Sequence, residues 1–242
     1  MTDDSRKRLL IINLGLTRYR RARQIQKAII ARRREHDLPD CLIITEHHPV
    51  ITMGRGTRPA NLLVSPERLA RDGIDLVKIE RGGDITFHGP GQVILYPIID
   101  LNHRARDMHR FLRDMEAFTI AALASLGLAA GTKEGLTGVW LDDHKIGAVG
   151  VAVSRWFTYH GLALNVDVNL DYFRLINPCG ITDYPVGNIT DHLDHPVTLD
   201  EVSRLLTEKF ADHFGYTDTA AEPLETILPP GRRPRYDHEK TL

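Results

Sequence analysis

The sequence predicts an α/β fold of the α+β type, with a mixed β-sheet flanked by helices. Strand and helix patterns alternate near the start of the chain, which is typical of an α/β protein. Three strand-like stretches then follow one another directly at residues 136–141, 145–153 and 161–166. Because neighbouring hairpin-like strands pair antiparallel, we expect a mixed sheet rather than a doubly wound parallel one.

Each expected element has a local signal. Short apolar or alternating runs bounded by turn residues predict strands. Besides the three strands above, these runs are residues 9–14, 41–45, 75–79 and 93–99. Helical periodicity or a helix start signal marks four segments, which are residues 17–36, 66–72, 106–126 and 199–214.

The helix signals differ from one segment to the next. In the first helix, Ile25 and Ile29 lie one turn apart on the same face. Pro66 follows a serine and occupies a first helical position, where its missing N–H costs nothing. Thr198 and Glu201 have the spacing of a capping box, which predicts the start of the final helix.

The domain organisation is simple. One hydrophobic core suffices for 242 residues, and residues 1–217 are expected to form a single domain. Residues 218–242 include the stretch EPLETILPPGRRPRY and are expected to be a Pro-rich C-terminal tail.

Composition excludes several classes of function. Lys and Arg total 31 against 32 for Asp and Glu, so no overall charge favours a nucleic acid or an anionic membrane as partner. No apolar stretch is long enough for a membrane span or a signal segment, and we expect a cytoplasmic protein. Cys41 and Cys179 are far apart and match no metal-ligand spacing, so neither a disulfide framework nor a metal site is expected.

Positive charge is concentrated in the first predicted helix. This cluster is either a solvated helix face or a dock for an acidic partner protein, because clustered cations steer anionic partners. Its members are Arg20, Arg21, Arg23, Lys27, Arg32, Arg33 and Arg34.

The segment RGGDITFHGPGQ, residues 81–92, is the first candidate for function. Two glycine clusters flank Arg81 and His88, and glycines let a ligand approach the main chain closely. The GxGxxG spacing of a dinucleotide site and the GK[ST] of a phosphate loop are both absent. A loop that cradles a ligand is therefore favoured over an ordinary hairpin.

A cysteine and a lysine supply candidate chemistry. Cys179 stands in the Pro/Gly loop NPCG, which core packing explains poorly, whereas Cys41 begins an apolar strand and is expected to be a core residue. A cysteine nucleophile acts as its thiolate, and the ammonium group of Lys145 in KIGAVGVAV is one candidate to stabilise it. Chemistry alone leaves His88 and His160 as competing partners.

Three segments together resemble the signature blocks of the LipB octanoyltransferase family. They are RGGDITFHGPGQ, then GVWLDDHKIGAVGVAVSRWFTYHGLALNV, then INPCGI, and the similarity extends over residues 9–214. The resemblance implies a biotin/lipoate ligase-like fold, with residues 1–217 as a catalytic acyltransferase domain. It also implies octanoyl transfer from an acyl carrier protein to a lysine of a lipoyl domain, the first step of endogenous protein lipoylation.

The resemblance also implies the site. Cys179 carries the acyl group as a thioester and Lys145 assists it. The implied acceptors are lipoyl domains of 2-oxoacid dehydrogenase complexes and the glycine cleavage H protein, and no cofactor is implied beyond the carrier's own phosphopantetheine. The implied substrate-binding residues are Arg81, Gly82, Gly83, Asp84, Ile85, Thr86, Phe87, His88, Ala148, Val149, Gly150, Gly161, Leu162 and Ala163.

Two other functions compete with this expectation. An ATP-dependent lipoate or biotin ligase of the same fold forms an acyl-adenylate and needs no cysteine, but its block typically runs GGGAVYHD, unlike RGGDITFHGPGQ here. An inert acyl-carrier-binding module would not need Cys179 and Lys145 together. Both are less favoured than a transferase.

Overall fold

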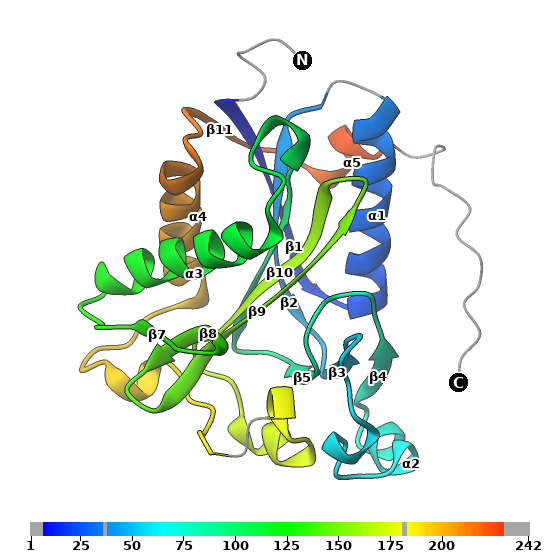
Figure 1. Ribbon diagram of the computed structural model, residues 1–242, viewed down its shortest axis with the longest axis vertical. Helices are drawn as coiled ribbons and strands as arrows, with labels where there is room; N and C mark the ends of the chain where they lie inside the picture. The colour runs from blue at the N-terminus through cyan, green and yellow to red at the C-terminus, as the bar shows by residue number, and fades with distance from the viewer. Residues whose placement is uncertain (1–6, 36–37, 181–182, 230–242) are drawn as a thin grey trace.

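The computed structural model describes residues 7–35, 38–180 and 183–229, except for the side chain of Cys179 (Figure 1). The described strands form two sheets, one of eight strands and one of three.

The large sheet runs in the order β11-β1-β2-β6-β10-β9-β8-β7. β1 pairs parallel with β2 and with β11, whereas all other neighbours pair antiparallel, so the prediction of a mixed sheet is confirmed. The strands are β1 (Arg8–Thr17), β2 (Asp40–His47), β6 (Gln92–Ile98), β7 (Gly131–Lys133), β8 (Leu136–Leu141), β9 (His144–Ser154), β10 (Phe157–Asn165) and β11 (Asp218–Ala221).

The small sheet runs in the order β4-β3-β5. Its strands are β3 (Val50–Met53), β4 (Asp75–Lys78) and β5 (Ile85–His88). The sequence did not predict β3, and it predicted a loop for residues 81–92, whereas β5 lies within them. The glycines on both sides of β5 hid a strand of four residues that pairs antiparallel with β3.

Helices cover both faces of the large sheet. α1 (Tyr19–Glu35) and α5 (Leu224–Ile227) lie on one face, and α3 (Met108–Ala124) and α4 (Leu199–Phe214) lie on the other (Figure 1). The predicted capping box at Thr198 begins α4, and Gly215 ends it in the left-handed conformation. The short elements are α2 (Pro66–Arg71), η2 (Pro59–Asn61), η3 (Leu101–His103), η4 (Leu170–Leu175), η5 (Pro178–Gly180) and η6 (Thr190–His192).

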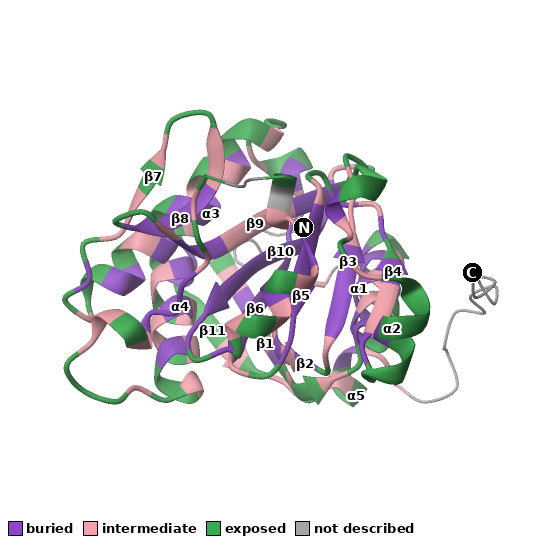
Figure 2. Ribbon diagram, turned by 90° about the horizontal axis from the view of Figure 1, so that it is seen from below, coloured by how far each residue is buried: buried purple, intermediate pink, exposed green. Residues whose placement is uncertain are grey.

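Alternating side chains of the sheet build a core on each face, and Figure 2 shows its central strands as buried. Leu9 and Leu42 pack with α3 and α4, whereas Leu10 and Cys41 pack with α1. Cys41 is fully buried, and burial raises the pKa of its thiol to about 12, so the prediction that it is a core residue is confirmed.

The C-terminal segment is attached to the sheet earlier than expected. Residues 218–221 form β11 beside β1, and the Glu222 N–H donates to Ile11 O at 2.9 Å. Ile227 of α5 is 2% exposed within the core on the α1 face. The expected boundary at residue 217 therefore falls too early, and residues 230–242 of the expected tail lie outside the described residues.

A helix that crosses a membrane must be both long and apolar. No helix within the described ranges meets both requirements.

Removal of β11 and α5 should destabilise the fold. A chain that ends at Thr217 exposes the edge of β1 and lacks the buried side chain of Ile227, whose burial alone contributes about 1.5–3 kcal/mol. We expect its free energy of unfolding in urea to fall by at least that amount. A chain that ends at Pro229 keeps every described contact and is the control; equal stability of the two chains would contradict the attachment.

Candidate functional site

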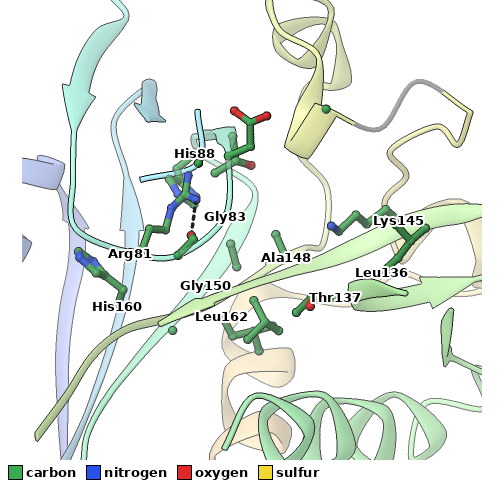
Figure 3. Close-up of a pocket in the computed structure, with 18 of the residues that line it drawn as sticks. Arg81, Gly83, His88, Leu136, Thr137, Lys145, Ala148, Gly150, His160 and Leu162 are labelled. Carbon is green, nitrogen blue, oxygen red and sulfur yellow. Dashed lines mark hydrogen bonds between the residues drawn. The ribbon is translucent and has the colours of Figure 1, made fainter. Parts of the chain in front are cut away.

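A cavity of about 480 Å³ lies where the glycine-rich segment meets β9 and β10 (Figure 3). The Gly82 N–H donates to Val151 O of β9 at 3.2 Å, which ties the segment to the sheet. Most residues implied by the resemblance line this cavity: Arg81, Gly82, Gly83, Asp84, Thr86, His88, Lys145, Ala148, Val149, Gly150, Gly161, Leu162 and Ala163.

Two of the implied substrate-binding residues do not line the cavity. Side chains alternate along β5, so Thr86 and His88 face the cavity while Ile85 and Phe87 point into a separate core cluster. Phe87 stacks there on Tyr172 at a centroid distance of 4.6 Å. The assignment of Ile85 and Phe87 as substrate-contacting residues is therefore wrong, and their role is packing.

Two glycines set the shape of the cavity. Gly150 and Gly161 are opposite each other across β9 and β10. A Cβ atom on Gly150 would lie 2.9 Å from Cδ of Arg81, and one on Gly161 would lie 2.2 Å from Leu95 O. Arg81 can therefore lie close against β9 only because residue 150 is glycine.

Arg81 is buried and held in one orientation. Its Nη2 donates to Thr52 O and to Thr52 Oγ1, both at 3.0 Å, and its Nη1 donates to Gly82 O at 3.1 Å. Thr52 was not a sequence candidate, since it lies in the unpredicted strand β3. A guanidinium at this place gives the cavity a fixed positive charge.

The hydrogen bonds of His88 can be assigned a direction. Gln92 donates both amide hydrogens, to Phe87 O and to Asn165 Oδ1, so Gln92 Oε1 must accept from His88 Nδ1 at 3.3 Å. Burial lowers the pKa of His88 well below its usual value, so the ring is neutral and Nε2 accepts from the Thr52 hydroxyl at 3.4 Å. Both ring nitrogens of His88 are therefore hydrogen-bonded, and Nε2 bonds to the Thr52 side chain that also holds Arg81.

His160 lies across the cavity from Lys145 (Figure 3). It has a left-handed backbone with φ of +61°, which is strained for a residue other than glycine. Its N–H donates to Gln26 Oε1 at 2.7 Å, and its Nδ1 lies 3.2 Å from the Tyr19 hydroxyl. These contacts with α1 make His160 a fixed part of the cavity wall away from Lys145.

Lys145 is buried at the other end of the cavity. Its N–H donates to Pro185 O at 2.9 Å, and its carbonyl accepts from the Gly187 N–H at 3.1 Å. Its Nζ lies 5.5 Å from the centre of the Trp140 ring. Lys145 therefore anchors the C-terminal side of the segment that contains Cys179.

A glycine and a buried acid shape the surroundings of Lys145. Gly138 has a φ of +138°, and a Cβ atom there would lie 2.6 Å from Cε of Lys145. The Gly138 N–H donates to Glu116 Oε1 at 2.7 Å, and Arg113 Nη1 lies 2.7 Å from Glu116 Oε2. Burial raises the pKa of Glu116. The Gly138 N–H, Arg113 and Lys145 each lower it, but burial has the larger effect. No spacing in the sequence pointed to Glu116.

The backbone of Cys179 lies in η5, next to Gly180, which lines the cavity. The Cys179 side chain lies outside the described part of the structure. The preceding Asn177 donates its N–H to Asn61 O at 2.8 Å, which fixes the N-terminal side of the loop. A second cavity of about 20 Å³ is lined by both Lys145 and Pro178, so the structure brings Lys145 and the cysteine loop together.

The basic cluster of α1 is less available than the sequence suggested. Arg23 Nη2 and Lys27 Nζ contact Glu80 Oε1 at 2.5 and 2.7 Å, and Arg33 is buried against Asp40 at 2.6 Å. Three of the seven cations thus serve the fold. The exposed members are Arg20, Arg21 and Arg34, and a dock for an acidic partner stays a prediction.

The fold, and the cavity at which Lys145 and the Cys179 loop meet, agree with the family whose sequence pattern the chain matches. Residues 18–211 match the family model described as "Lipoyl protein ligase A/B catalytic domain". The chain therefore belongs to the lipoyl protein ligase A/B catalytic domain family.

Curated relatives and solved structures agree with this membership. Proteins named Octanoyltransferase from Koribacter versatilis and Geobacter metallireducens are 41% and 43% identical to the chain; the first alignment covers 96% of this chain and 98% of the relative, the second 84% and 92%. A lipoate-protein ligase A bound with ATP has a TM-score of 0.75 at 20% identity, over 92% of both chains. A bi-partite lipoate protein ligase from Thermoplasma acidophilum has a TM-score of 0.72 at 21% identity, over 92% of this chain and 90% of that one. These structures confirm the predicted fold.

Acid should destabilise the fold through His47, which lies behind the cavity. Its Nδ1 donates to Thr17 O at 2.8 Å and its Nε2 accepts from the Tyr96 hydroxyl at 2.7 Å, while burial lowers its pKa from 6.5 to about 4. Unfolded His47 binds its proton below pH 6.5, so stability is complete above that pH and falls as the pH approaches 4. We expect a loss of about 2 kcal/mol from pH 7 to pH 5.

The measurement is urea unfolding at several pH values. The His47→Gln variant lacks this titration and should show a smaller pH dependence, with His88 and His160 supplying the remainder. An identical slope for the variant and the unmodified chain would contradict this account of His47.

Proposed function

We propose that this protein transfers an octanoyl group from an acyl carrier protein to a lysine of a lipoyl domain, through a thioester on Cys179. The observation that carries the proposal is the cavity, in which Lys145 and the Cys179 loop meet in a chain 41–43% identical to proteins named Octanoyltransferase. The acyl carrier donor and the thioester come from the family resemblance and from the chemistry of a loop cysteine.

The cavity suits an aliphatic acyl chain. Its 480 Å³ lies within the range of about 300–1,000 Å³ that is usual for small-molecule sites. Ile94, Val149, Leu162 and Ala163 give it an apolar surface between Lys145 and the polar residues around His160. An alkyl chain gains free energy by leaving water for this surface, about 0.8 kcal/mol per buried CH₂ group.

The first half-reaction exchanges one thioester for another. The Cys179 thiolate attacks the carrier thioester carbonyl, the new C–S bond forms, and the bond to the carrier sulfur then breaks. The leaving carrier thiolate takes a proton from Lys145 as general acid. Because reactant and product are both thioesters, this step needs no external energy source.

The second half-reaction makes an amide. The lysine amine of the acceptor attacks the Cys179 thioester, its proton passes to neutral Lys145, and the Cys179 thiolate leaves. An amide is more stable than a thioester, so the step is downhill and we propose that neither ATP nor a metal takes part. Among the described residues, no group of three or more His, Cys, Asp or Glu side chains is arranged to hold a metal ion.

The acceptor is proposed to be a lipoyl domain, with those of 2-oxoacid dehydrogenase complexes and the glycine cleavage H protein as examples. The Thermoplasma acidophilum ligase of similar fold was studied with its E2 lipoyl domain. The cytoplasmic location and the acyl carrier protein as donor remain part of the same proposal.

Intact mass spectrometry tests the covalent mechanism. We expect the chain to gain the mass of one octanoyl group when it is mixed with octanoyl carrier protein in the absence of ATP. Cys179→Ser should show no gain, because a hydroxyl is a far weaker nucleophile than a thiolate at neutral pH. Cys41→Ser is the control and should be acylated normally; acylation that requires ATP would favour an adenylating ligase instead.

Lys145→Arg separates the two proposed roles of this lysine. Arg keeps the positive charge but does not release its proton near neutral pH, because guanidinium has a pKa above about 12. We expect Cys179 still to be acylated in this variant, but more slowly, because Arg does not supply a proton and the carrier sulfur leaves as a thiolate beside the positive charge. We expect the acyl-enzyme to accumulate, since the second half-reaction lacks its base. Lys133, whose Nζ also lies 5.5 Å from the Trp140 ring, gives the control Lys133→Arg; normal single-turnover rates in both variants would exclude Lys145 from catalysis.

A further inference from the structure

Asn61 joins the glycine-rich segment to the cysteine loop. It ends η2, is 9% exposed and lines the cavity. Its backbone carbonyl accepts the Asn177 N–H, and its side-chain Nδ2 donates to Asp84 Oδ2. No motif in the sequence singles out Asn61, although Asp84 belongs to the glycine-rich block.

The orientation of the Asn61 amide follows from its partner. Asp84 Oδ1 accepts the Ile85 N–H at 2.7 Å, and Asp84 Oδ2, as a carboxylate oxygen, accepts too. The NH₂ end of Asn61 must therefore face Asp84, and only one of its two hydrogens is used in this bond. In the part of the chain that the structure describes, no acceptor bonds to the second hydrogen.

The amide lies directly beside the nucleophile segment. A Cβ atom on Gly180 would lie 3.3 Å from Asn61 Nδ2 and 3.3 Å from Asp84 Oδ2. Gly180 follows Cys179 directly and lines the same cavity. An N–H donor with one free hydrogen is thus fixed next to the backbone that carries the reacting cysteine.

We propose that Asn61 is a further catalytic residue, whose free amide N–H donates a hydrogen bond to the acyl oxygen during both half-reactions. The inference rests on the proposed function. When Cys179 sulfur, or in the second half-reaction the nitrogen of the acceptor amine, bonds to the acyl carbon, the C=O electron pair moves to the oxygen, which becomes an oxyanion. When the intermediate collapses, that pair restores the C=O bond and the bond to the leaving sulfur or to Cys179 breaks.

This arrangement stabilises the transition state more than the bound acyl group. A hydrogen bond to an oxyanion is shorter and about twice as strong as one to a neutral carbonyl. Asp84 holds the amide in place before the reaction, so little reorganisation is needed when charge develops. Loss of one such donor typically lowers kcat by about 10²- to 10³-fold.

The test compares two reactions of Cys179. Acylation by an octanoyl thioester forms an oxyanion, whereas alkylation by iodoacetamide, a displacement at a saturated carbon, forms none. In Asn61→Ala we expect single-turnover acylation to slow by about 10²- to 10³-fold, while alkylation stays within about twofold of the unmodified chain. Asn102→Ala is the control, because Asn102 also donates its side-chain N–H to an aspartate, Asp100, but in an exposed pair outside the cavity lining.

A reversed pair tests the same idea if Asn61→Ala does not fold. The double variant Asn61→Asp with Asp84→Asn keeps a carboxylate and an amide in contact but leaves residue 61 without a side-chain N–H. It should also be alkylated normally and acylated slowly. Normal acylation in either folded variant overturns the inference, as does a parallel loss of alkylation, which would mean that Asn61 only positions the loop. If the unmodified chain takes no octanoyl group, the proposed function fails and the inference with it.

Discussion

The close packing of Arg81 against β9 is the constraint on which the candidate site depends. Gly150 allows the Arg81 side chain to lie on the strand, and Gly161 opposite allows β10 to approach the backbone of Leu95. A side chain at residue 150 would push Arg81 of the glycine-rich segment away from β9, and one at residue 161 would collide with the backbone of β6. The cavity is therefore a property of two missing side chains as much as of the residues that line it.

The buried side chains of Thr52, His88 and Gln92 form one chain of hydrogen bonds beside Arg81. Thr52 accepts from Arg81 and donates to His88, while Gln92 fixes the ring of His88 from the other side. Unpaired, each of these groups would cost about 1–3 kcal/mol of desolvation. His88 is neutral and serves as a hydrogen-bonding residue of the cavity wall. A histidine in a glycine-rich segment therefore need not act as a general acid or base.

The sequence predicted the site segments better than it predicted their geometry. Strand and helix periods located β8, β9, α3 and α4, because long apolar patterns and a capping box are local signals. β3 and β5 were missed because four-residue strands flanked by glycine carry little period, and β11 because its pairing with β1 is set by tertiary contact. The resemblance implied that Ile85 and Phe87 bind substrate together with their neighbours. The alternation of side chains along β5 instead directs these two into the core and their neighbours into the cavity. Asn61 contacts Asp84, and Glu116 contacts Gly138. Both partners are distant in the sequence, so no local motif could predict these contacts.

The parallel pairing of β1 with β11 bears on how the chain is made. β1 is the first described strand to leave the ribosome, yet the strand that covers its outer edge is the last. Until then β1 presents free backbone N–H and C=O groups on one side, where another chain can pair. Contacts between such distant segments slow folding, and the helices on the two faces of the sheet do not pair with this edge, so the edge of β1 stays open until residues 218–221 have been made.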